Sequence, residues 1–186
     1  MKQLILVLFF ISAIAAVSKA QDIPYVDDRI VYEHIFDFPG SSKDELYSFS
    51  KISIADAFVN ANYVVQSDDS ESGIIVGKGV TSFVRDFKNL LKLPRKFKFS
   101  VRIDSKDERV RIRLYDIIYI DELSNPRRNT EIPFELLEQS ERQNIGKSKR
   151  RLEAYNKKSE AYNDHFYSLI VLFKRGIEKQ KTESDW

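Results

Sequence analysis

The sequence predicts an α+β fold, in which an antiparallel sheet of about five strands carries helices on one face. Three observations indicate this class. A helical pattern follows the first strand-like run, four further β-rich runs come next, and a long amphipathic pattern lies near the end of the chain. The expected order is therefore strand, helix, four strands and helix, or β-α-β-β-β-β-α.

The first twenty residues have the three-part layout of a cleavable export signal. Lys2 precedes an apolar run at 4–16, and a small-x-small triplet follows at 18–20. The run is shorter than the roughly 18 to 20 residues that cross a bilayer. We therefore expect residues 1–20 to be a signal peptide, with a mature chain that begins near Gln21 and is periplasmic or extracellular. An uncleaved N-terminal anchor is the alternative.

Composition limits the classes of protein that remain. Of the 30 Lys and Arg residues, two lie in the expected signal, which holds no acid, so 28 bases face 28 acids in the mature chain. This balance gives no support to a polyanion-binding role. The chain has no cysteine, which excludes disulfides and thiolate metal sites. A domain of about 165 residues must therefore be held together by its core alone.

The first two elements after the signal have clear local patterns. Apolar and polar residues alternate at 31–38, which predicts a strand that stops at Pro39. Ser42 and Glu45 form a capping box, which predicts the start of a helix. We expect this helix to end at 60–62. Its apolar face is expected to carry Leu46, Phe49, Ile52, Ala55 and Phe58 or Val59.

Four β-rich runs follow, at 63–66, 74–84, 97–105 and 109–119. The polar clusters at 67–72 and 106–108 are short enough for hairpins, so the sheet is expected to be an antiparallel meander. The longer connection at 86–96 is expected to contain a helical turn that is broken at Pro94.

The composition changes after the last of these strands. We expect an α+β domain at 21–120, then a polar connection at 121–147 with a short helix at 133–139. Residues 148–181 carry apolar side chains at three- and four-residue spacings, which predicts one long amphipathic helix packed on or extending from the domain.

The last helix offers two further interpretations. Its aromatic residues are more typical of core or dimer contacts than of a ligand site, so a homodimer through this helix is one expectation. They are Tyr155, Tyr162, Phe166 and Phe173. Its basic beginning is expected instead to contact an anionic membrane surface. The cations concerned are Lys147, Lys149, Arg150 and Arg151.

Three stretches of these elements form a set: PGSSKDELY at 39–47, GIIVGKGV at 73–80 and VRIRLYDIIY at 110–119. Together they resemble a family of exported bacterial domains of unknown function (DUF4468), whose fold is like that of the TATA-binding protein. The similar region covers about 30–119. The resemblance implies a fold and a compartment, and it brings no known catalytic residues.

Motifs for catalysis or for cofactors are weak throughout. The glycines at 73–79 lack the spacing of a phosphate loop and indicate a bulge or close packing instead. His34 and His165 are the two histidines, too few for a metal site without cysteine. The acidic cluster at 67–72, with Asp68, Asp69 and Glu71, is either a solvated hairpin tip or a calcium site. We expect no cofactor, no metal and no catalytic residue.

Pleat geometry predicts one candidate binding surface. On the strands at 97–105 and 109–119, alternate side chains should face the helices, and the others should lie on the uncovered side of the sheet. That side should carry Lys98, Arg102, Arg111, Arg113, Tyr115, Ile117 and Tyr119. Guanidinium and aromatic groups suit anionic or planar ligands. Export argues against nucleic acid and leaves an anionic glycan, a lipid or an acidic protein segment.

The alternative is that these cations pair across strands in an ordinary solvated ladder with Glu33, Asp37 and Asp104. Taken together, the patterns favour a non-catalytic binding or adaptor module of the cell envelope. The second function class is an envelope hydrolase with an active site that the sequence does not reveal.

Overall fold

The computed structural model describes residues 22–57, 64–87, 91–122 and 130–184. Its elements, in chain order, are β1 (Tyr25–Val26), β2 (Arg29–Ile30), β3 (Tyr32–Asp37), α1 (Lys43–Ala57), β4 (Val64–Asp69), β5 (Ile74–Phe87), β6 (Leu91–Lys106), β7 (Arg109–Asp121), β8 (Thr130–Pro133), α2 (Phe134–Gln143) and α3 (Lys149–Ser184).

The main sheet has the strand order β3-β7-β6-β5-β4, and β8 pairs with β7 as a sixth strand. All of its pairs are antiparallel, so the predicted meander from β4 to β7 is confirmed. The count of about five strands is too low. β1 and β2 have two residues each and form a separate hairpin, and β8 has four residues, so none of the three is long enough to show a clear alternation.

The segment at 86–96 differs from the prediction. Instead of a helical turn, β5 runs to Phe87 and β6 begins at Leu91, and the pairing continues between them. Pro94 is tolerated because it lies beyond Lys96, the last residue of β6 that pairs with β7. At that point β6 has one neighbouring strand, so the N–H group that proline lacks is not needed by a second.

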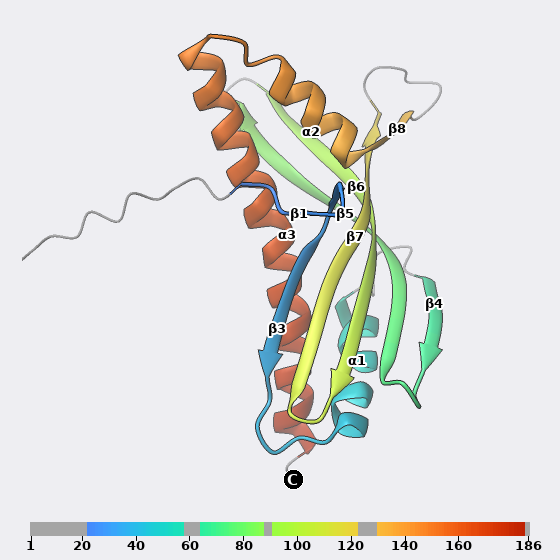
Figure 1. Cartoon of the computed structure of the whole chain (residues 1–186). Coiled ribbons are helices and arrows are strands. Elements are labelled where there is room, and N and C mark those ends of the chain that lie inside the picture. Colours follow the sequence, from blue (N-terminus) through green and yellow to red (C-terminus); the bar gives the residue numbers. More distant parts are fainter. Residues whose placement is uncertain (1–21, 58–63, 88–90, 123–129, 185–186) are drawn as a thin grey trace, which may run out of the picture.

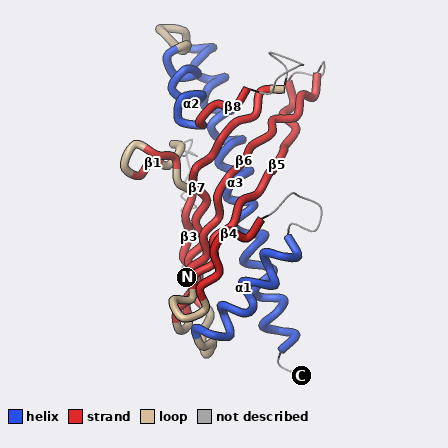
Figure 2. The backbone as a smooth tube through the Cα atoms, turned by 90° about the vertical axis from the view of Figure 1, so that its right-hand side faces the viewer, coloured by secondary structure: helices blue, strands red, loops and turns tan. Residues whose placement is uncertain are grey.

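Helices α1 and α3 cover one face of the sheet, as predicted. Figure 1 looks onto the other face with both helices behind it, and Figure 2 shows the layers from a direction 90° away. Alternate residues of β6 and β7 enter the core between the layers. The buried set includes Phe97, Phe99, Val101, Ile103, Val110, Ile112 and Leu114, together with Tyr162, Phe166 and Phe173 of α3. Three of the four aromatic residues predicted for the face of the last helix, Tyr162, Phe166 and Phe173, are thus part of this chain's own core.

The capping box predicted for α1 is present. The backbone N–H of Ser42 donates to Glu45 Oε2 at 2.8 Å, and Ser42 Oγ lies 3.4 Å from the backbone nitrogen of Glu45. The predicted apolar face of the helix is wrong in part. Ile52 is 43% exposed, whereas Ser50 and Ser53 are buried. Phe58, Val59 and the expected helix end at 60–62 lie outside the described residues.

The small residues of α1 are buried because they allow it to approach α3 closely. Ser53 Oγ donates a hydrogen bond of 2.8 Å to the backbone oxygen of Phe173. A Cβ atom on Gly176 would lie 2.8 Å from Ser53 Cβ, which is closer than real Cβ atoms approach. Ser53 and Gly176 therefore form a close contact between the two helices.

The N-terminal hairpin β1–β2 is held by acids of α2. Tyr25 Oη donates to Glu138 Oε2 at 2.7 Å, and the backbone N–H of Ile30 donates to Glu135 Oε1 at 2.9 Å. Glu138 is 2% exposed and also accepts hydrogen bonds from Tyr155 and Arg142. Burial alone would raise the pKa of Glu138, but these donors hold it below its usual value.

Some predictions fall on parts of the chain that the structure does not describe. The expected signal peptide at 1–20 is one, and the segment 123–129 of the polar connection is another. Among the residues that are described, no helix is both long enough and apolar enough to cross a bilayer.

We predict that Gly176→Ala destabilises the protein by about 1 to 3 kcal/mol, because the new methyl group overlaps Ser53. At a helix position with open space around it, the same change would stabilise the protein by about 0.5 to 1 kcal/mol. The sign of the change in unfolding free energy therefore distinguishes the two cases. Urea unfolding measures the difference, with Lys179→Ala on the exposed side of α3 as the control. A more stable Gly176→Ala variant would contradict the proposed overlap.

We also predict that His165 makes the fold sensitive to acid. Burial lowers the pKa of His165 to about 4, and its Nε2 atom lies 2.9 Å from Thr81 Oγ1 of β5. In the unfolded chain the pKa is about 6.5, so the unfolded state binds the proton first and stability falls as the pH drops from 6.5 towards 4. Urea unfolding at pH 7 and pH 5 should show a smaller loss for His165→Gln than for the wild type. Equal losses would refute this role.

Candidate functional site

The uncovered face of the sheet, opposite α1 and α3, carries rows of charged side chains from β3, β7 and β6. Glu33, Arg113 and Arg102 occupy one row, because Glu33 pairs with Arg113 and Arg113 pairs with Arg102. In the next row Arg111 lies opposite Asp104. Four of the predicted site residues, Arg102, Arg111, Arg113 and Tyr115, therefore share this part of the face.

Asp104 is the centre of these rows. Its Oδ1 accepts hydrogen bonds from Arg102 Nε and Nη2 at 2.9 and 2.8 Å, and its Oδ2 accepts from Arg111 Nε and Nη2 at 3.1 Å each. Each carboxylate oxygen is thus contacted by two nitrogens of one guanidinium group. Burial alone would raise its pKa, but the two guanidinium groups hold the pKa of Asp104 below its usual value.

The remaining arginines are paired as well. Arg113 donates to Glu33 Oε2 from Nε at 2.7 Å and from Nη2 at 2.6 Å. Arg109 Nε lies 3.7 Å from Asp37 Oδ1 at the exposed end of the sheet. The acids are those that the ladder alternative names. We call this set the charge ladder; it consists of Glu33, Asp37, Arg102, Asp104, Arg109, Arg111 and Arg113.

Pairing changes what the charge ladder offers to a ligand. Each guanidinium already has a carboxylate partner, and Asp104 serves two of them. An anion that bound Arg111 or Arg113 would have to compete with these bonds at close range. The charge ladder is therefore primarily a structural feature of the sheet and only secondarily a candidate binding surface.

A β-bulge divides β7 above the charge ladder. Lys98 pairs with Ile118 while Ser100 pairs with Tyr115, so β7 has one residue more than β6 between these pairs. Asp116 lies in the bulge with a φ of +48°. The extra residue shifts the alternation of side chains by one position for the rest of the strand.

This shift corrects the predicted positions of Tyr119 and Ile117. Both belong to the helix-covered side: Ile117 is 1% exposed, and the ring centroid of Tyr119 lies 5.5 Å from that of Phe97 in the core. The guanidinium group of Arg95 also lies over the Tyr119 ring, with its Cζ atom 5.4 Å from the ring centroid. Tyr119 is therefore not on the uncovered face, because the prediction assumes an unbroken alternation along β7.

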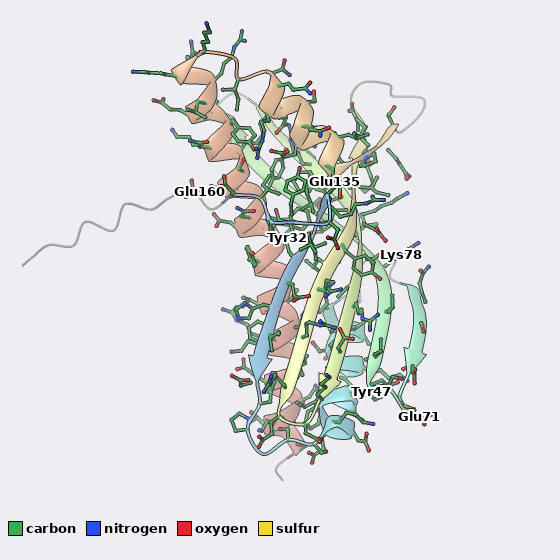
Figure 3. The ribbon with its side chains drawn as sticks, viewed as in Figure 1. Tyr32, Tyr47, Glu71, Lys78, Glu135 and Glu160 are labelled. Atoms are coloured by element: carbon green, nitrogen blue, oxygen red, sulfur yellow. The ribbon has the colours of Figure 1, made fainter. Side chains whose placement is uncertain are left out.

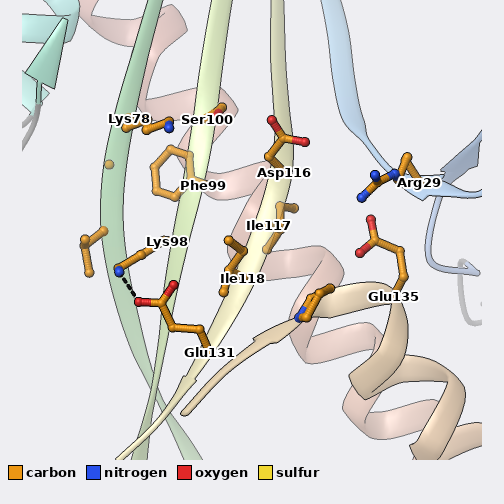
Figure 4. A pocket seen from close by; sticks show the side chains of 13 residues that line it. Arg29, Lys78, Lys98, Phe99, Ser100, Asp116, Ile117, Ile118, Glu131 and Glu135 are labelled. Atoms are coloured by element: carbon orange, nitrogen blue, oxygen red, sulfur yellow. Dashed lines mark hydrogen bonds and ion pairs between the residues drawn. The ribbon is translucent and has the colours of Figure 1, made fainter. Parts of the chain in front are cut away.

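A pocket of about 650 Å³ lies beside the bulge on the uncovered face. We call it the bulge pocket. Ile118 of β7, Val80 of β5 and Pro133 of β8 supply its apolar lining. Figure 3 shows Lys78 on β5 and Glu135 at the start of α2, and Figure 4 shows how the polar side chains surround the space between them. The charged lining residues are Arg29, Lys78, Lys98, Asp116, Glu131 and Glu135.

Charges in the bulge pocket are only partly paired. Lys98, a predicted site residue, forms an ion pair with Glu131 of β8. Glu135 Oε1 accepts the hydrogen bond from Ile30. Lys78 and Asp116 are exposed, and neither forms an ion pair with any residue that the structure describes. Lys78, Arg29 and Asp116 thus present charges without an ion-pair partner among the described residues, above an apolar lining.

Other candidate chemistry has structural explanations. Asp68 accepts hydrogen bonds from Tyr47 and Lys51, and Asp69 Oδ1 accepts the backbone N–H of Ser72 at 3.0 Å. Across the described ranges, no group of three or more His, Cys, Asp or Glu residues is placed to hold a metal ion. The acidic cluster therefore belongs to the hairpin between β4 and β5.

The sequence contained one usable signal for the bulge pocket. Aliphatic residues of β7 follow a period of two through Val110, Ile112 and Leu114, and the next one is Ile117, three residues on. Asp116 is the polar residue that occupies the break. Lys78 and Glu131 give no such signal, because their approach depends on how β5 and β8 are placed around β7.

Comparison with known proteins agrees with this fold. Residues 32–120 match the family described as a domain of unknown function (DUF4468) with TBP-like fold, which confirms the resemblance. A solved TBP-like protein from Parabacteroides distasonis ATCC 8503 is 14% identical, with a TM-score of 0.63 over 84% of this chain and 97% of that one. A DUF4468 family protein from Bacteroides ovatus ATCC 8483 is 18% identical, with a TM-score of 0.59 over 84% and 91%. No curated protein matches the sequence. These similarities concern the fold alone.

We predict that Asp104→Asn destabilises the fold by about 1 to 3 kcal/mol, because it leaves Arg102 and Arg111 without their shared carboxylate. Asp37→Asn is the matched control, since Asp37 is 81% exposed and its pair should contribute less than about 0.5 kcal/mol. Urea unfolding of both variants tests the difference. A cost for Asp104→Asn no larger than that for Asp37→Asn would show that the shared carboxylate of Asp104 does not stabilise the sheet.

Proposed function

We propose that this protein is a non-catalytic binding module of the cell envelope and that the bulge pocket is its binding site. The envelope location rests on the export signal that the sequence predicts at 1–20. The site rests on the pocket's unpaired charges. On the same face, the arginines of the charge ladder are neutralised by carboxylates, whereas Lys78 and Asp116 remain available to a ligand.

The dimensions of the bulge pocket suit a small ligand group or a few residues of a peptide. Its volume of about 650 Å³ lies within the roughly 300 to 1,000 Å³ of typical ligand sites. Lys78 belongs to β5 and Asp116 to β7, with β6 between them. Their strands are therefore separated by two inter-strand spacings, or about 10 Å. A ligand that meets both charges must therefore reach across β6 and carry groups of opposite charge.

The sign of the lining charges favours a protein segment over a purely anionic glycan or lipid. Three cations and three acids line the pocket, so it has no net preference for anions. An anionic ligand near Lys78 would also approach Asp116 and Glu131. A polypeptide can place an acidic and a basic side chain on one extended segment, and its apolar groups can contact Ile118 and Pro133.

Binding accounts for these observations better than hydrolysis does. The hydroxyl of Thr81 lies 2.9 Å from the imidazole of His165. This pair joins α3 to β5 on the helix-covered side and is not part of the bulge pocket. Its packing role in the fold explains the contact without a reaction.

The experiment is capture of envelope proteins on the immobilised mature protein, followed by identification and affinity measurement of what is retained. We expect Lys78→Glu and Asp116→Asn each to weaken binding of the retained partner at least tenfold, which corresponds to about 1.4 kcal/mol. Asparagine suits this test because it tolerates the positive φ of Asp116.

Lys179→Glu is the control, because Lys179 is an exposed cation on α3 outside the pocket. It should bind like the wild type. A partner that binds all four proteins equally would show that the bulge pocket is not the binding site.

A further inference from the structure

A second charged surface lies at the joint between α2 and α3. We call residues 142–158 the basic tip; they contain seven Lys and Arg residues and one Glu. The rest of the chain after residue 20 contains 21 bases and 27 acids, so the positive charge of this end is offset elsewhere. Figure 1 shows the joint at the top of the molecule, at the opposite end from the C-terminus.

The cations at the outer end of the basic tip are free. Lys147, Lys149, Arg150 and Arg151 are exposed, and none forms an ion pair within the described part of the chain. Arg151 donates to the backbone oxygen of Asn144 at 3.2 Å, which leaves its charge uncompensated. The paired cations, Arg142 and Lys158, are bound to Glu138 and Glu141 nearer the core.

These cations occupy an electrostatically unfavourable position at the start of α3. Lys149, Arg150 and Arg151 occupy the first turn of α3, which contains no acidic residue. The N-terminus of a helix carries partial positive charge, so cations there oppose helix formation and acids would support it. An ordinary solvated helix start would carry the opposite charge. The arrangement therefore suggests an external anionic partner.

The basic tip also exposes an apolar side chain. Leu152 follows the three cations directly and is 45% exposed. A groove of about 430 Å³ runs between α2 and α3 nearby, but of the four free cations only Arg151 lines it. Lys147, Lys149 and Arg150 are therefore not directed at a ligand in the groove. Cations spread around an exposed leucine match an extended anionic surface better than a compact ligand.

We propose that the basic tip docks the protein on a membrane surface that contains anionic lipids. The free cations interact with lipid phosphates, and Leu152 enters the boundary between headgroups and acyl chains. This proposal is independent of the bulge pocket, whose lining shares no residue with the tip. A docked molecule would leave the uncovered face of the sheet accessible to a second partner.

The test is flotation of the purified mature protein with two kinds of vesicle, pure phosphatidylcholine and phosphatidylcholine with 30% phosphatidylglycerol. We expect binding to the anionic vesicles only, and we expect it to fall as salt rises from 0.05 to 0.5 M. The variant Lys147→Glu/Lys149→Glu/Arg150→Glu should bind about 100-fold more weakly, since each basic residue near an anionic surface contributes a factor of about five.

Two measurements separate docking from damage to the fold. The triple variant should melt at the same temperature as the wild type or higher, because its new acids suit the start of α3. Lys106→Glu/Arg175→Glu/Lys179→Glu makes the same change in net charge at exposed positions near the other end of the molecule, and it should keep most of the binding.

Three results would overturn the proposal. One is equal binding of the wild type to neutral and anionic vesicles, and another is equal weakening by the two triple variants. The third is retention of the wild type on poly-glutamate together with no binding to either vesicle. That result would assign the basic tip to an acidic protein partner instead.

Discussion

The bulge at Asp116 determines how the two ends of the sheet differ. Before the bulge, even-numbered residues of β7 enter the core and β3 is the neighbouring strand. After the bulge, odd-numbered residues enter the core and β8 is the neighbouring strand. The change of neighbour leaves space that the hairpin β1–β2 and the start of α2 partly fill. The bulge pocket is what remains of that space. One additional residue thus positions the pocket, the last strand and the helical hairpin beyond it.

Elements whose apolar residues keep a regular spacing along their whole length could be predicted from the sequence. Local interruptions of that spacing could not. The meander, the long last helix and the capping box at Ser42 follow from alternation, helical spacing and a two-residue motif. The face of α1 could not be found this way, since Ser53 looks solvent-facing until Gly176 is placed against it. The candidate surface was predicted only in part: Arg102, Arg111 and Arg113 lie on the uncovered face with acids that the ladder alternative names, whereas the partner of Lys98 is Glu131 of β8, which no pattern indicates.

Charge is distributed in two different ways in this nearly neutral protein. In the charge ladder, Arg102, Arg111 and Arg113 each lie within about 3 Å of a carboxylate on the same strand or on a neighbouring one, which neutralises them. At the basic tip, cations collect without acids, and the compensating negative charge lies elsewhere along the chain. The first arrangement stabilises the sheet, whereas the second leaves a field that extends about a Debye length into solution. The net charge of the protein does not distinguish these two arrangements.

The attachment of the first strands to the last helices affects the order in which the molecule can assemble. Tyr25 and Tyr32 bond to Glu138 and Asn163, which lie 113 and 131 positions later, and β3 pairs with the far end of the meander. These contacts cannot form until nearly the whole chain has been synthesised. The segment that contains Tyr25 and Tyr32 therefore lacks these long-range partners until late in biosynthesis.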